Sequence, residues 1–161
     1  MSDSAKSGEL THLDARGLAR MVDVSEKPVT RRRAVASGRV RVSAALAAQI
    51  TANSVRKGNL LEVARLAGIQ AAKQTATLIP LCHNLPLDQV HVEAWLEGQY
   101  VQLRAEARTE AKTGVEMEAL TAVAVAALTV VDMGKAVDAG MVIEEIRLLE
   151  KTGGCSTGPA T

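Results

Sequence analysis

Two carboxylates flank a methionine just before the longest apolar stretch of the chain, in the segment AKTGVEMEAL at residues 111–120. Thr113 and Glu116 have the spacing of a capping box, which satisfies the free amides at the start of a helix, so we favour capping over catalysis for Glu116. Glu118 lies about 200° further around the helix axis, and a carboxylate beside a buried run needs a partner or a ligand. Met117 predicts either core packing or contact with a planar ligand.

The far end of the same predicted helix, VDMGKAVD, places Asp132 and Lys135 three residues apart on one face. The simplest interpretation is an ordinary ion pair worth about 0.2–0.5 kcal/mol. Asp132 follows an apolar run, however, and burial would tune it toward proton transfer. It lies 14 residues after Glu118, roughly 21 Å along a helix. The two can share one small site only if subunits meet.

Two further segments carry groups suited to an anionic ligand. Lys57 and Gly58 precede a predicted helix start, which attracts phosphate or carboxylate, although an exposed surface lysine is the commoner case. The basic residues 31–33, Lys73 and Lys151 could add positive charge. His83 follows Cys82 on an irregular connection between Pro80 and Pro86, where functional groups are frequent. A Cys-His nucleophilic pair is a weak alternative, because neighbouring side chains of an extended chain point apart.

Composition restricts the class of protein. The 161 residues predict one domain, and their net charge of +1 predicts no global attraction to nucleic acid or membranes. The longest apolar run has 13 residues, against about 20 for a membrane span, and the first ten residues lack the apolar core expected of a signal peptide. Two cysteines and three histidines fit neither a disulfide framework nor a zinc spacing. We expect a cytoplasmic protein, a single domain over residues 1–161, with mobile ends at 1–20 and 153–161.

The elements that must position these groups alternate between strands and helices. A first strand with a bulge at Gly38 precedes two helices at 43–54 and 59–78, and a hairpin turning at Gly98-Gln99 follows. A helix over 115–138 and a strand over 141–151 complete the chain. This order predicts an α+β, ferredoxin-like (split βαβ) antiparallel sheet with helices on one face and an extra N-terminal helix. The last helix is apolar on nearly all sides, which predicts contact with another subunit or cover by the chain's own helices.

The motifs resemble those of the cyclic pyranopterin monophosphate synthases, the molybdenum cofactor biosynthesis C family. The resemblance covers nearly the whole chain, through blocks such as KGNLLEVARLAGIQAAK, LIPLCHNLPLD and TGVEMEALTAVAVAALTVVDMGKAV. It implies a ferredoxin-like homohexamer, a trimer of dimers with sites at subunit interfaces. The implied activity is conversion of 3′,8-cyclo-7,8-dihydroguanosine 5′-triphosphate to cyclic pyranopterin monophosphate with release of pyrophosphate, a lyase-type reaction.

The same resemblance implies roles for individual residues. Asp132 corresponds to a catalytic aspartate, with Lys57 and Lys135 as its acid/base or phosphate-polarising partners. One departure is Cys155, which stands where we expect a lysine. The resemblance implies no metal site and no required cofactor, although Mg²⁺ could accompany the triphosphate. The implied substrate-binding residues are Leu81, Cys82, His83, Glu116, Met117 and Glu118, with Asp23, Arg32, Lys73 and Lys151 nearby.

Other functions are compatible with the same fold. A nucleotide- or RNA-binding module is the main alternative, because fold does not fix function. The absence of Phe, with one Trp and one Tyr, argues against RNA binding by base stacking. A scaffold without chemistry and an enzyme acting on another nucleotide also remain open.

Overall fold

A computed structural model describes residues 13, 14, 16–154, 158 and 159 of the chain. The prediction about Cys155 and most of the predicted mobile ends lie outside these residues. Four long strands and two long helices make up the body. In chain order the elements are β1 (Thr30–Arg41), α1 (Ala44–Thr51), α2 (Leu60–Ala72), α3 (Thr75–Leu78), β2 (Gln89–Glu97), β3 (Tyr100–Ala111), α4 (Glu116–Gly134), β4 (Val142–Thr152) and the two-residue β5 (Gly158–Pro159).

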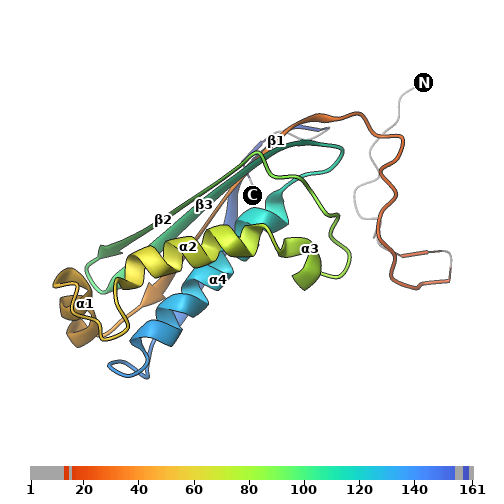
Figure 1. Ribbon diagram of the computed structural model, residues 1–161. Helices are drawn as coiled ribbons and strands as arrows, with labels where there is room; N and C mark the ends of the chain where they lie inside the picture. Colours follow the sequence, from red (N-terminus) through yellow and green to blue (C-terminus); the bar gives the residue numbers. More distant parts are fainter. Residues whose placement is uncertain (1–12, 15, 155–157, 160–161) are drawn as a thin grey trace.

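The sheet has the strand order β2-β3-β1-β4-β5, and every neighbouring pair is antiparallel. Strands β1 and β2 are therefore parallel to each other and separated by β3, which is the split βαβ arrangement. Helices α2 and α4 lie side by side across one face of this sheet, and α1 lies at one end (Figure 1). The α+β prediction is confirmed, and the ferredoxin-like arrangement is consistent with this sheet. The extra helix is α1, which follows β1, and no helix precedes β1 among the described residues.

Small and branched aliphatic side chains fill the core, as the scarcity of aromatic residues requires. Val40, Val101, Val123 and Val130 are fully buried between the sheet and α4. By length and composition α4 could cross a membrane, but it packs against α2, β1 and β3 as a core helix. Its outer side still carries Leu128 with 58% of its surface exposed. The predicted subunit contact on that side stays a prediction.

Several predicted boundaries move by a few residues. Asn59 caps α2 as expected, since its Oδ1 accepts a hydrogen bond from the amide of Glu62 at 3.1 Å. The helix predicted over 59–78 is divided, because α2 ends at Ala72 and a separate turn of helix, α3, follows. The last helix ends at Gly134, four residues before the predicted Asp138. Helix starts fixed by a local cap are thus predicted better than helix ends.

The expected bulge near Gly38 is present on one side of β1 only. Pairing with β3 continues without interruption, whereas the register with β4 shifts between Val35 and Ala36 and again between Ser37 and Arg39, with the extra residue on β4 each time. A Cβ at Gly38 would lie 2.8 Å from Cγ1 of Val123 and 3.0 Å from Cγ1 of Ile146. The glycine therefore lets α4 approach the sheet closely.

Candidate active site

A pocket of about 630 Å³ opens where the start of α4 meets the connection between α3 and β2 and the segment before β1. The predicted substrate-binding residues that line it come from two stretches of sequence, residues 81–83 and 116–118. Turns after α3 and before β2 keep the first stretch irregular, so that its groups face the helix start. The complete lining is Val22, Val24, Lys27, Ile79, Leu81, Cys82, His83, Leu85, Thr113, Gly114, Glu116, Met117 and Glu118.

Glu118 is the buried acid of this pocket. Only 4% of its surface is exposed, and burial raises the pKa of its carboxyl from 4.5 to about 7. The hydrogen bond from its own amide acts in the opposite direction, and the negative charge of Glu116 adds to the increase. The desolvation cost of the charged form is the main cause. The expectation that a carboxylate is buried here is confirmed, and near neutral pH it can either donate or accept a proton.

Glu116 has a different environment from Glu118. Its Oε1 lies 3.2 Å from Nζ of Lys151, at the end of β4. Helix α4 begins at Glu116 itself, and its N-cap residue Val115 makes no side-chain capping hydrogen bond. The capping-box prediction for Thr113 and Glu116 is wrong, because Glu116 turns toward the lysine from a distant strand.

Cys82 and His83 face the same pocket but do not behave as a nucleophile and its base. Nε2 of His83 lies 2.8 Å from the carbonyl oxygen of Val22, which can only accept, so this nitrogen carries the proton. Burial, together with the negative charge of Glu118, raises the pKa of the Cys82 thiol above its usual value. The raised pKa of the thiol argues against the Cys-His nucleophilic pair, which needs a stabilised thiolate.

The thiol of Cys82 gives a direct probe of the pocket. In a Cys155→Ser background, we expect iodoacetamide at pH 7 to alkylate Cys82 several-fold more slowly than a free cysteine, because the thiolate is the reactive form. Glu118→Gln should accelerate the reaction at pH 8, since it removes a negative charge that raises the thiol pKa. Mass spectrometry of timed samples measures both rates. Alkylation as fast as that of a free thiol would contradict the burial.

A second cluster of predicted residues gathers at the other end of α4. Nζ of Lys57 lies 3.1 Å from Oδ2 and 2.7 Å from the carbonyl oxygen of Asp132. Nζ of Lys135 lies 2.7 Å from Oδ1 of the same carboxylate. The two lysines, Lys135 first, lower the pKa of Asp132. The helical spacing predicted the pair of Asp132 and Lys135 correctly, and the family resemblance implied that Lys57, 75 residues away, joins them.

The predicted burial of Asp132 is wrong for the single chain. Its side chain is 59% exposed. The buried face of α4 packs against α2 and the sheet, and Asp132 lies outside that face. The lysine charges, and not desolvation, set the protonation of Asp132. In this environment the carboxylate is ionised at neutral pH.

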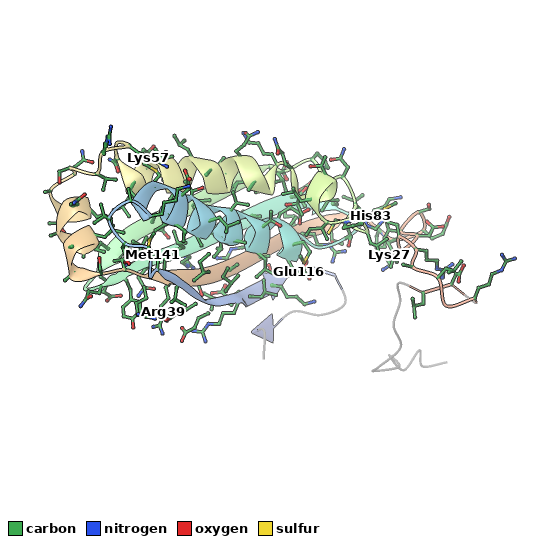
Figure 2. All side chains as sticks on the ribbon, turned by 90° about the horizontal axis from the view of Figure 1, so that it is seen from below. Lys27, Arg39, Lys57, His83, Glu116 and Met141 are labelled. Atoms are coloured by element: carbon green, nitrogen blue, oxygen red, sulfur yellow. The ribbon has the colours of Figure 1, made fainter. Side chains whose placement is uncertain are left out.

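The two clusters lie far apart within one chain. Lys57 and Glu116 stand toward opposite ends of the helical layer, with His83 beyond Glu116 (Figure 2). Helix α4 separates Glu118 from Asp132 by 14 residues, roughly 21 Å at the rise of an α-helix. A single small substrate cannot contact both clusters of the same chain.

Three other residues that the resemblance implied for the site lie outside the pocket lining. Asp23 turns back to Ser25, whose amide and hydroxyl donate to its Oδ1 at 2.9 and 2.6 Å, and these bonds lower its pKa. Arg32 donates to the carbonyl oxygens of Ala111 and Lys112 at 3.5 and 3.3 Å. Lys73 is the exposed C-cap residue of α2. None of the three lines the pocket.

Lys27 lines the pocket, but the sequence did not predict it as a site residue. It comes from the segment before β1, whose composition resembles an ordinary loop. The only local signal is its position directly before Pro28. Its contribution depends on the folding of that segment against residues 79–85, which no local spacing predicts.

Comparison with known proteins identifies the family. The model of the MoaC family matches residues 21–154. This chain belongs to the MoaC family. A cyclic pyranopterin monophosphate synthase of Thermomicrobium roseum is 60% identical over 150 residues, covering 92% of this chain and 90% of the relative. Proteins of the same name from Parvibaculum lavamentivorans and Nostoc sp. are 56% and 57% identical, covering 92% and 93% of this chain and 94% and 90% of their own.

Family membership agrees with the sequence-based resemblance, and both clusters described above fall inside the matched range. Among the described residues, no group of three or more His, Cys, Asp and Glu side chains is arranged to hold a metal ion. Of the two acids of the pocket, Glu116 instead pairs with Lys151, and Glu118 is buried close enough to Glu116 for their charges to interact.

Proposed function

We propose that this chain is a cyclic pyranopterin monophosphate synthase, an enzyme of molybdenum cofactor biosynthesis. It converts 3′,8-cyclo-7,8-dihydroguanosine 5′-triphosphate to cyclic pyranopterin monophosphate and releases pyrophosphate. The observation that carries the proposal is the 60% identity to a relative of that name over 92% of the chain. A pocket of about 630 Å³ is also large enough for a nucleotide-derived substrate.

The reaction requires proton donors, proton acceptors and cations, and the two clusters supply them. The pocket holds the ring system between residues 81–83 and 116–118, with Glu118 able to exchange a proton near neutral pH. The ionised Asp132, held between Lys57 and Lys135, serves as the catalytic base. The lysines stabilise the negative charge on the triphosphate and on the leaving pyrophosphate.

The active site in this proposal combines groups from two copies of the chain. The roughly 21 Å along α4 supports it, and so do the exposed Val63, Leu66 and Leu128 on the helical layer. We propose the homohexamer, a trimer of dimers, as the assembly. Light scattering of the purified protein measures the mass that decides the number of chains.

Mixing two variants with impaired activity tests the shared site. Asp132→Asn keeps the pocket intact, and Glu118→Gln keeps the lysine-aspartate cluster intact. After joint unfolding and refolding in equal amounts, we expect activity in about one quarter of the sites, because each site then draws its halves at random from two chains. No recovery, with assembly intact by light scattering, would mean that both clusters act within one chain.

The remaining features of the proposal concern partners and location. The protein requires no cofactor of its own, Mg²⁺ can enter with the triphosphate, and the enzyme acts in the cytoplasm without nucleic acid or membrane. Phosphorus NMR of the protein with the cyclised triphosphate tests the activity directly. Pyrophosphate and a cyclic phosphate are the expected products. An unchanged substrate, together with salt-dependent binding of single-stranded RNA, would favour the binding module instead.

A further inference from the structure

The lysine-aspartate cluster combines residues from two separate segments. Asp132 and Lys135 belong to the end of α4, whereas Lys57 comes from the loop that follows α1. All three side chains are substantially exposed, with 59%, 61% and 45% of their surfaces accessible. Exposed ion pairs contribute only about 0–1 kcal/mol, too little to hold the segments together. Something else must fix α1 against the end of α4.

The carboxylate of Asp138 makes that connection. Its Oδ2 accepts a hydrogen bond from the amide of Ser43 at 2.6 Å, directly before α1. Its Oδ1 accepts one from the amide of Gly140 at 2.9 Å. Its own amide donates to the carbonyl oxygen of Gly134 at 3.0 Å, at the last residue of α4. One half-buried side chain therefore joins the turn after α4 to the start of α1.

Close packing reinforces the connection. A Cβ at Gly134 would lie 2.6 Å from Cδ2 of Leu46 and 3.2 Å from the sulfur of Met141. Leu46 belongs to α1 and is fully buried, so it has little room to move. Helix α1 thus rests directly on the last residue of α4, and Ser43 accepts the amide hydrogen bond of Leu46 that begins α1.

We propose that Asp138 is a positioning residue, which holds α1 and its following loop so that Lys57 reaches Asp132. The proposal rests on the proposed catalytic role of the cluster, because Asp138 itself contacts none of its three side chains. Arg41 and Asp138 line one small cavity, but Arg41 pairs with Glu144 at 3.2 Å. Without the Asp138 anchor, Lys57 withdraws and Lys135 remains as the only cation against Asp132.

Two series of variants test the anchor from its two ends. Asp138→Ala removes both acceptors, whereas Asp138→Asn retains one carbonyl oxygen. Ser43→Pro removes the donor amide and suits the φ of −69° at this position. Ser43→Ala is its matched control, because it loses the cap to Leu46 but keeps the amide. The Ser43 pair keeps the test informative if Asp138→Ala does not fold.

The first readout is independent of catalysis. Carboxyl-carbon NMR follows the titration of Asp132, whose pKa Lys57 helps to lower. We expect this pKa to rise toward its ordinary value in Asp138→Ala and Ser43→Pro, to rise less in Asp138→Asn, and to stay unchanged in Ser43→Ala. Gly68→Ala is a remote control, since its Cβ would meet the carbonyl oxygen of Ala122 at 3.0 Å and strain α2 instead.

The second readout is steady-state turnover. A misplacement near 1 Å can reduce a rate about 100-fold, so we expect kcat to fall about 10–100-fold in Asp138→Ala with little change in KM. A lower melting temperature with an unchanged Asp132 titration and unchanged kcat would overturn the proposal. If the wild type has no synthase activity while the Asp132 titration moves as expected, the anchor stands and the proposed function fails.

Discussion

Replacing Asp132 by Asn is expected to lower kcat for pyrophosphate release by about 10²–10⁴-fold, the range of general acid–base catalysis. The substitution removes the ionised carboxylate but keeps its shape, and both lysines keep an oxygen to contact. Asp132 is exposed and belongs to no part of the core, so the melting temperature should change by less than a few degrees. Phosphorus NMR of the cyclised triphosphate measures the rate.

Glu62→Gln is the matched control for this substitution. Glu62 is also an exposed helical carboxylate with a partner three residues away, Arg65 at 2.6 Å. It lies outside both clusters, so its variant should turn over like the wild type. Normal turnover by Asp132→Asn would remove Asp132 from the catalytic role while leaving the activity in place.

Glu118→Gln is expected to stabilise the protein at alkaline pH and to impair its activity. The folded-state pKa of Glu118 is about 7 and its ordinary value is 4.5, so the folded chain binds the proton more tightly than the unfolded one. The free energy of unfolding of the wild type therefore falls as the pH rises from about 4.5 to above 7. Glutamine has no charge to bury. Relative to the wild type, the free energy of unfolding of the variant should therefore be higher by up to about 3 kcal/mol at pH 8.5 and unchanged at pH 4.

The activity of the same variant should change in the opposite direction. Loss of a buried group that contacts the substrate and exchanges its proton should lower kcat/KM by about 10–100-fold. The wild-type rate should also show a transition near pH 7 that the variant lacks. Urea unfolding at both pH values and a pH–rate profile measure these effects. Equal stability of the two proteins at pH 8.5 would show that Glu118 is ionised in the fold at little cost.

The functional groups could be predicted from sequence only as far as local patterns reach. Asn59 before an amphipathic run predicted the start of α2, and the alternation around Gly98 predicted the hairpin. Glu118 could be singled out because a carboxylate beside an apolar run has no local explanation. Lys27 could not, because it reaches the pocket only through the path of a long irregular segment.

The capping-box error has the same origin. Thr113 and Glu116 have the right spacing, and a local rule assigns them to each other. In the folded chain Lys151 of β4, 35 residues away in sequence, forms an ion pair with Glu116. Both contacts of the Glu116 carboxylate would be charge-assisted, so the spacing in sequence cannot rank them, and the position of Lys151 in the fold determines the role of Glu116.

By itself, the sequence determined the order of elements, the antiparallel sheet with its helical layer, and the placement of Asp132 and Lys135 on one face of a helix. These follow from periodicity, turns and short helical spacings, which depend on neighbours along the chain. Only the tertiary structure decided that Asp132 is exposed and that Asp138 joins α1 to the end of α4. Burial and long-range hydrogen bonds depend on which surfaces pack together, and that packing is a property of the whole fold.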